Sequence, residues 1–204
     1  MERFETEEQQ VEAIKRFWKE NGLAIGIGVV LGIGGLYGWR YYNDSQIASQ
    51  ETASTSYETV VASLNADNTA QAEAFVDNNN NGYSVLTALQ LAKLAVDNED
   101  LAAASKHLQH VATHASDAAI KSVANVRLAR IQNALSEYDK ALSTLLLVTQ
   151  DSFKAQVSEI KGDVFVNQGK FEEAKAAYND SLDADENNQL VKMKLDNLAI
   201  AVNG

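Results

Sequence analysis

The stretch from Leu23 to Trp39, LAIGIGVVLGIGGLYGW, is a long and almost entirely apolar run. Between Glu20 and Arg40 there is no Asp, Glu, Lys, Arg or His. A helix needs roughly 17–25 mostly apolar residues to cross the core of a bilayer, so this stretch predicts a membrane-spanning helix. The expected parts of the chain are a tail over residues 1–20, a span over 21–42 and one soluble domain over 43–204.

Glycine is concentrated between Gly22 and Trp39, a segment that holds seven of the chain's eleven glycines. Glycine weakens a helix in water, but lipid offers the backbone no other hydrogen-bond partner, so the helix remains the favoured structure. Gly28, Gly32 and Gly35 fall on one face of that helix, where small residues would let a second helix dock closely. The alternative is that the helix merely tolerates these glycines, as membrane helices often do.

Charge predicts the orientation of the span. Cations precede it at Arg3, Lys15, Arg16 and Lys19, whereas after Arg40 the next cation is Lys93. The positive-inside rule therefore places the N-terminus in the cytoplasm and the large C-terminal part outside it. An uncleaved signal anchor is favoured over a cleaved signal peptide, because the leading segment is long and acidic and no A-x-A site follows the apolar run directly.

The tail reads as an amphipathic helix that leads into the span. Thr6 and Gln9 can form a capping box, and apolar residues recur at helical spacing from Val11 to Trp18. Two interpretations remain open. The tail lies on the lipid with its cations near anionic headgroups, or it docks on a cytoplasmic partner.

The composition of the domain that follows limits its possible partners, chemistry and fold class. From Asn43 onward there are 12 Lys and Arg against 22 Asp and Glu, a net charge of −10 that would repel nucleic acid. The chain has no cysteine, hence no disulfide or thiolate chemistry, and no proline. With alanine, leucine and glutamate frequent, this composition predicts an all-α domain. Its first helices are expected at residues 46–64 and 69–76, before a loop at DNNNNG, residues 77–82.

Helical repeats are the informative pattern of the second half. One set of positions resembles a tetratricopeptide repeat (TPR) over 34 residues: Gly162, Phe165, Gly169, Phe171, Ala174, Tyr178 and Leu182. It departs from the TPR pattern at Glu186, where proline is usual. Fainter copies lie at Leu128, Ala129, Tyr138 and Ala141, and at Leu91, Ala92, Leu101, Ala104 and Leu108. We therefore expect a TPR-like α-solenoid of helical hairpins, with an insertion near 113–118 and a capping helix over 187–202.

The resemblance to TPR proteins implies a concave partner-binding groove lined by the first helix of each hairpin. The corresponding residues are Leu89, Lys93, Val96, Val126, Arg130, Asn133, Glu159, Asp163 and Asn167. Charge along this set runs from basic to acidic, which would give a charged partner one preferred direction. The alternative is that these residues only solvate the concave side.

No pattern in the sequence predicts catalysis or a cofactor. The three histidines, His107, His110 and His114, share one stripe of a helix. A solvated polar edge is the favoured interpretation, against an adventitious metal site or a pH-responsive patch. The sequence has no P-loop, G-x-S-x-G, H-E-x-x-H or dinucleotide fingerprint, so we expect a binding protein and not an enzyme.

Three segments together resemble the YfgM family, the ancillary subunit of the Sec translocon in gammaproteobacteria. They are VEAIKRFWKENG (11–22), GLYGWRYYN (35–43) and RLARIQ (127–132). The resemblance implies a single-pass inner-membrane protein with a cytoplasmic N-terminus and a periplasmic TPR-like domain. The implied partners are the Sec channel subunits, a membrane-anchored parvulin-type periplasmic chaperone and other periplasmic chaperones.

Two functions from different classes are compatible with this resemblance. The first is a membrane-tethered adaptor that recruits periplasmic folding factors to the translocon. The second is a regulatory tether whose cytoplasmic tail sequesters an envelope-stress response regulator.

Overall fold

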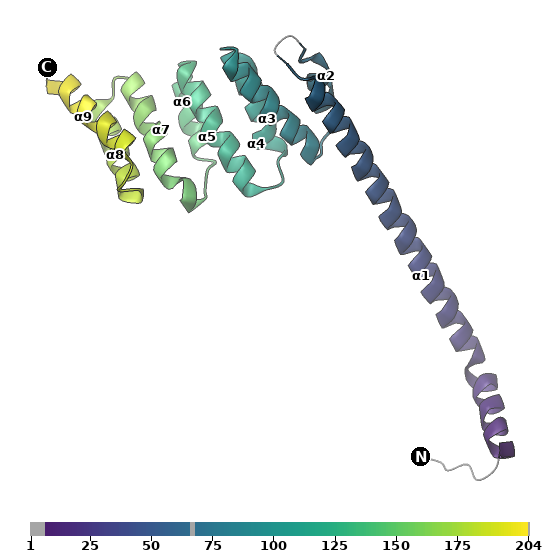
Figure 1. The fold of residues 1–204 in the computed structure, drawn as a ribbon. Helices are drawn as coiled ribbons and strands as arrows, with labels where there is room; N and C mark the ends of the chain where they lie inside the picture. Colours follow the sequence, from purple (N-terminus) through teal and green to yellow (C-terminus); the bar gives the residue numbers. More distant parts are fainter. Residues whose placement is uncertain (1–6, 66–67, 204) are drawn as a thin grey trace. The chain divides into compact units, whose positions relative to one another are not determined.

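The computed structural model describes residues 7–65 and 68–203, and every regular element in those ranges is a helix (Figure 1). This confirms the all-α prediction. The chain divides into two compact units, Met1–Ala53 and Ser54–Gly204.

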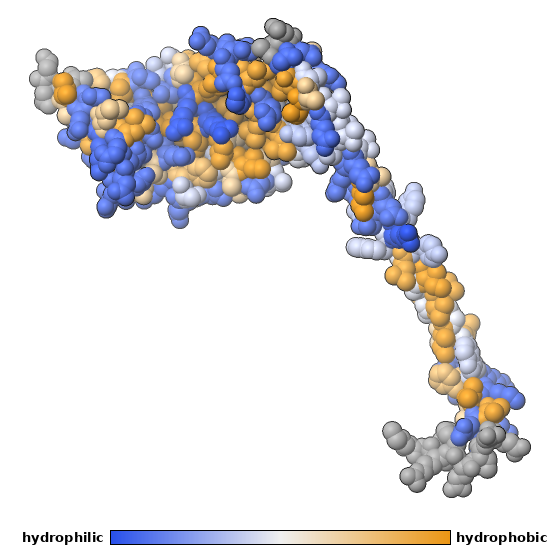
Figure 2. Space-filling model, in the orientation of Figure 1, coloured by the Kyte–Doolittle hydropathy of each residue, from blue (hydrophilic) through white to orange (hydrophobic). Residues whose placement is uncertain are grey.

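Helix α1 (Glu7–Ser63) makes up the described part of the first unit and continues into the second. It contains the predicted span and the helix predicted over 46–64 as one uninterrupted element. Of the helices described, α1 is the one long and apolar enough to cross a membrane. Its apolar side chains are exposed, Leu23 by 81%, and Figure 2 shows them as a band between more polar segments. Thr6 of the predicted capping box and Arg3 lie outside the described residues.

The second unit confirms three helical hairpins and a final helix (Figure 1). After α2 (Ala70–Asn78), the hairpins are α3 (Gly82–Asp97) with α4 (Leu101–His114), α5 (Ala118–Ala134) with α6 (Tyr138–Leu145), and α7 (Lys154–Asn167) with α8 (Phe171–Ala184). A short 3-10 helix, η1 (Asp151–Phe153), precedes α7, and α9 (Gln189–Asn203) is the predicted capping helix. The predicted loop before the first hairpin is present, but only between Asn78 and Gly82.

The three hairpins turn in the same way. Each connection has three residues, and the middle one has a left-handed backbone: φ is 61° at Glu99, 60° at Ser136 and 72° at Gly169. In each turn the third residue donates its N–H over 2.8 Å to a carbonyl in the last turn of the preceding helix, at Ala95, Gln132 and Phe165 respectively. This is a Schellman-type ending, and it shows that the faint upstream repeats are structurally equivalent to the clear one.

The apolar core is a series of small clusters instead of one central core. Val60, Val76, Leu91 and Val111 belong to the first cluster, Leu145, Ile160 and Val164 to another, and Tyr178, Val191 and Leu198 to the last. A further group, Ala92, Leu108 and Leu128, joins the first two hairpins. Each cluster is covered by its neighbouring helices, as expected of a solenoid.

The predicted insertion near residues 113–118 is wrong. Helices α4 and α5 are joined by only Ala115–Asp117, and the Asp117 side chain caps α5 by accepting hydrogen bonds from the N–H groups of Ala119 and Ile120 at 2.7 and 3.0 Å. Most of the extra repeat length lies within α5, which has 17 residues against 14 in α7.

Candidate partner-binding groove

A groove of about 500 Å³ lies between α3 and α5, the first helices of adjacent hairpins. Helix α5 packs mainly on α4 and α6, less on α7, and contacts α3 least of these. Leu108 of α4 contributes to its lining from the second helix of the first hairpin. The remaining lining residues are Leu89, Gln90, Ala92, Lys93, Val96, Asp97, Arg127, Arg130 and Ile131.

The groove combines apolar lining with cations. Leu108 and Ala92 are buried beneath it, and Val96 exposes 43% of its surface. Lys93 is paired with Asp97 on the same helix. No ion pair reaches Arg127 or Arg130 among the residues that the structure describes. The groove therefore offers two uncompensated guanidinium groups beside apolar surface.

The structure brings together part of the predicted groove. Leu89, Lys93, Val96 and Arg130 all line this one cavity. Sequence reasoning missed Arg127, which lies one helical turn before Arg130. The i, i+3 spacing of the two arginines within RLARIQ was the signal that could have found it.

Val126 does not line the groove. It is only 3% exposed and belongs to the apolar cluster that holds Ile160 and Val164 of α7. The prediction placed it on the concave surface, and the structure corrects this because α5 and α7 pack closely at that position.

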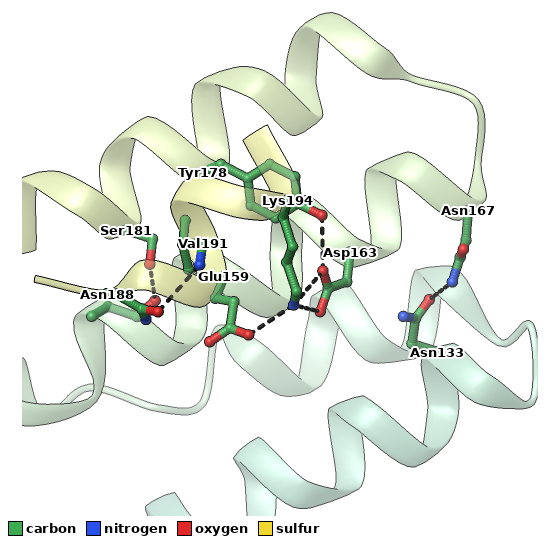
Figure 3. A network of polar contacts seen from close by, with 10 residues as sticks. Asn133, Glu159, Asp163, Asn167, Tyr178, Ser181, Asn188, Val191 and Lys194 are labelled. Atoms are coloured by element: carbon green, nitrogen blue, oxygen red, sulfur yellow. Dashed lines mark hydrogen bonds and ion pairs between the residues drawn. The ribbon is translucent and has the colours of Figure 1, made fainter. Parts of the chain in front are cut away.

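Glu159 and Asp163 were predicted as the acidic end of the groove, and the structure pairs them with the chain's own α9 instead. Lys194 Nζ lies 2.7 Å from Glu159 Oε1 and 2.8 Å from each carboxylate oxygen of Asp163 (Figure 3). Glu159 is 7% exposed. The predicted run from basic to acidic is therefore interrupted by the capping helix, and the exposed groove is basic.

Tyr178 completes this network from α8. Its hydroxyl donates a hydrogen bond of 2.8 Å to Asp163 Oδ1 (Figure 3). Burial of the phenol and this bond to a carboxylate raise the pKa of Tyr178 well above its usual range. Burial alone would lower the pKa of Lys194, but its bonds to Asp163 and Glu159 outweigh that effect and raise it.

Asn133 and Asn167 join α5 to α7. The side-chain amide of Asn167 donates to Asn133 Oδ1 at 3.0 Å, across 34 residues of sequence (Figure 3). Both lie outside the cavity between α3 and α5. They tie successive hairpins together through an exposed hydrogen bond.

The histidine stripe is not uniformly solvated. His107 is 5% exposed, so the prediction of a solvated edge is wrong for this residue. His110 and His114 stack with ring centroids 4.1 Å apart, and His114 is exposed. In the described ranges, no three His, Cys, Asp or Glu side chains form a group that could hold a metal ion.

The glycine stripe lies in the open. A Cβ placed on Gly28, Gly32 or Gly35 would meet nothing within 4 Å. The chain itself therefore puts no packing demand on these glycines.

Comparisons with known proteins agree with this architecture. The family model described as "Tetratricopeptide repeat-like domain" matches residues 15–200. A protein of Escherichia coli (strain K12) named "Ancillary SecYEG translocon subunit" is 37% identical over 206 residues, covering 98% of this chain and 100% of its own length. Proteins of the same name from Haemophilus influenzae and Aggregatibacter actinomycetemcomitans are 35% and 34% identical, each over 94% of this chain and 97% of their own length.

Fold and groove together define a TPR-like helical-repeat protein whose N-terminal helix is a candidate membrane span. The similarity to the three ancillary SecYEG translocon subunits extends over nearly the full chain, and it identifies the family more specifically than the fold does. The chain belongs to the YfgM family, which confirms the resemblance drawn from its tail, span and repeat motifs.

Proposed function

We propose that this chain is an ancillary subunit of the Sec translocon that acts as a membrane-tethered adaptor. The observation that carries the proposal is the 37% identity, over nearly the whole of both chains, to a protein named as such a subunit. The adaptor pairs with a membrane-anchored parvulin-type periplasmic chaperone and helps to pass newly exported proteins to periplasmic folding factors.

The proposed location is the inner membrane, crossed once by α1, with the N-terminus in the cytoplasm and the TPR-like domain in the periplasm. Lys15, Arg16 and Lys19 lie just before the span, whereas after Arg40 no cation follows until Lys93, and this distribution supports the orientation. The exposed apolar band on α1 supports insertion, because soluble surfaces rarely leave such a continuous apolar area uncovered.

A tether of this kind changes binding through effective concentration. A groove held close to the channel exit meets emerging chains at a local concentration that reaches about the millimolar range for short linkers. Even weak contacts at the α3–α5 groove then suffice for transfer. We propose this binding role in place of catalysis, since the groove supplies apolar and cationic contacts.

Crosslinking of the tagged full-length chain in native membranes tests the proposal. We expect recovery of the channel subunits and of a parvulin-type chaperone. A well-expressed, inserted chain that captures neither would contradict the adaptor role.

A regulatory tether is the second candidate, and the exposed tail favours it. Ile14, Phe17 and Trp18 each expose more than half of their surface beside Lys15 and Arg16. Such a surface suits a cytoplasmic response regulator or the lipid itself. Replacing residues 1–20 by an unrelated tail separates the two functions: unchanged envelope-stress signalling removes the regulatory candidate, and the adaptor proposal requires unchanged chaperone recruitment.

A further inference from the structure

The α3–α5 groove is basic within an acidic domain. From Asn43 onward the net charge is −10, yet Lys93, Arg127 and Arg130 gather at one cavity where Asp97 is the acidic lining residue. Asp97 is already paired with Lys93. Within the described part of the chain no ion pair reaches Arg127 or Arg130, so a ligand would meet both arginines unpaired.

The spacing of these arginines suits carboxylates. Arg127 and Arg130 are three residues apart on α5, which puts their side chains on the same face about 5–6 Å apart at Cβ. Guanidinium groups bind carboxylates through two parallel hydrogen bonds, a geometry that an ammonium group does not offer. Both side chains are exposed and free of ion pairs within the described ranges, so a ligand carboxylate need not displace an internal partner.

The apolar lining selects a second property of the ligand. The cavity volume of about 500 Å³ falls within the range of roughly 300–1,000 Å³ of known ligand clefts. Leu89, Val96 and Ile131 line it beside the cations, with Leu108 buried beneath. Aliphatic side chains of a partner would bury apolar surface against these residues, which favours binding.

The domain charge limits how acidic the ligand can be. At physiological salt, charges are screened beyond about 8 Å, so the two arginines act only at short range. A long polyacidic tract would extend past them over a surface with net charge −10 and be repelled. One or two acidic side chains next to aliphatic residues satisfy both conditions.

We infer that the α3–α5 groove binds a partner-protein segment in which one or two Asp or Glu side chains lie next to aliphatic residues, with Arg127 and Arg130 holding the carboxylates. The inference rests on the proposed adaptor function and names the chemistry of the partner that the groove accepts. The carboxylates are those of side chains within the segment, not of a chain terminus.

The test uses the full-length chain in phosphatidylcholine nanodiscs and fluorescent peptides of about twelve residues, acetylated and amidated at their ends. The first peptide carries two glutamates among leucines. Three others replace glutamate by glutamine, replace leucine by serine, or consist of glutamate throughout. We expect fluorescence anisotropy, corrected with empty nanodiscs, to show the first peptide binding about tenfold more tightly than the others, as two charge-assisted contacts would allow.

Arg127→Gln with Arg130→Gln should remove this advantage, and Val96→Ser should weaken binding without changing its salt dependence. The matched control is Lys154→Gln with Lys175→Gln, two exposed cations of α7 and α8 away from the groove, which should leave binding unchanged. Equal binding of the glutamine peptide, equal binding of the all-glutamate peptide, or full binding by the double arginine variant would each overturn the inference.

Failure of the proposed function gives a different result. If the wild-type chain is not crosslinked to the translocon, the adaptor role falls, while the anisotropy measurements still decide the chemistry of the groove. If the double arginine variant reaches the translocon but loses the peptide, the inference stands together with the adaptor role.

Discussion

The ring of Tyr178 on α8 lies directly against the backbone of Gly162 on α7. A Cβ built on Gly162 would overlap Cδ1 and Cε1 of Tyr178 and lie 2.9 Å from Cζ. The close approach brings the two helices together and aims the Tyr178 hydroxyl at Asp163, which Lys194 of α9 also contacts. One missing side chain thus sets the geometry of the third hairpin and its cap.

Gly162→Ala should destabilise the domain by about 1–3 kcal/mol, the usual cost of overpacking a core. The sign is informative because alanine in place of glycine within an unconstrained helix is stabilising by about 0.5–1 kcal/mol. Urea unfolding followed by circular dichroism measures the change. Gly82→Ala, at the first residue of α3, is the control for the added methyl group, since nothing lies within 4 Å of its Cβ. A Gly162→Ala variant as stable as the control would contradict the packing described.

Ser136→Gly should stabilise the protein, because Ser136 has a left-handed backbone with φ of 60° in the turn between α5 and α6. Such a conformation costs a residue with a Cβ about 1 kcal/mol, and glycine avoids it. Gly169→Ala, in the equivalent turn with φ of 72°, should lower the free energy of unfolding by a similar amount. The same urea experiment compares them, and opposite signs are expected. A stability change of the same sign in both variants would mean that the two turns are not equivalent.

Lys194→Met should destabilise the docking of α9, because it leaves the buried Glu159 carboxylate without its cation. Lys194 is partly exposed, so we expect about 1–3 kcal/mol, below the full cost of breaking a buried pair. Hydrogen exchange of α9 amides measures the local effect. Lys192→Met, at an exposed position on the same helix, is the control and should change little.

Alkaline pH should weaken the same network. The pKa values of Lys194 and Tyr178 are both raised on folding, so the protonated forms are favoured in the native state. Their contribution to the free energy of unfolding is complete below about pH 10, the unfolded pKa of tyrosine. It is lost as the pH rises above that value. The urea midpoint should fall above about pH 10, and Tyr178→Phe should reduce that fall. An unchanged pH profile in Tyr178→Phe would exclude a role for the phenol.

Acid should destabilise the first hairpin through His107. Burial lowers the pKa of His107, and Lys106 adds to this, while Glu73, Asp77 and Asp100 oppose it more weakly. The neutral form of His107 is favoured in the native state. Its contribution to the free energy of unfolding is therefore present above about pH 6.5 and is lost as the pH falls through the native pKa. The urea midpoint should decrease between about pH 7 and pH 5. His107→Gln should flatten this decrease, and the exposed His114→Gln should not.

Much of the fold could be predicted because its signals are local. The apolar run from Leu23 to Trp39 and the helical periodicity around Phe171 and Tyr178 need no knowledge of distant contacts. Even the faint repeats at Leu91 and Leu128 were enough to place all three hairpins.

The site was harder to predict because it depends on contacts between distant residues. Lys194 reaches Glu159 across 35 residues, and no local pattern shows that α9 would fold over that carboxylate. Helical periodicity places Val126 and His107 on particular faces of their helices. It does not show whether those faces are exposed or pack against a neighbouring helix. Arg127 belongs to the groove only because α3 and α5 stand apart, a property of the assembled solenoid.

Gly28→Leu with Gly32→Leu should weaken assembly in the membrane without preventing insertion. Both positions face open space in this chain, so leucine creates no internal clash and adds apolar surface to the span. Close docking of another helix on this face would be blocked. Co-purification with the channel subunits, compared with membrane insertion by alkaline extraction, measures the effect. Undiminished assembly would mean that α1 is only a tether.

Photo-crosslinkers placed singly at Gly32 and at Arg130 in living cells test the adaptor account most directly. We expect Gly32 to crosslink to a membrane helix of the translocon or of its chaperone, and Arg130 to crosslink to a periplasmic partner. Abundant, inserted chains that give no translocon or chaperone product from either position would contradict it.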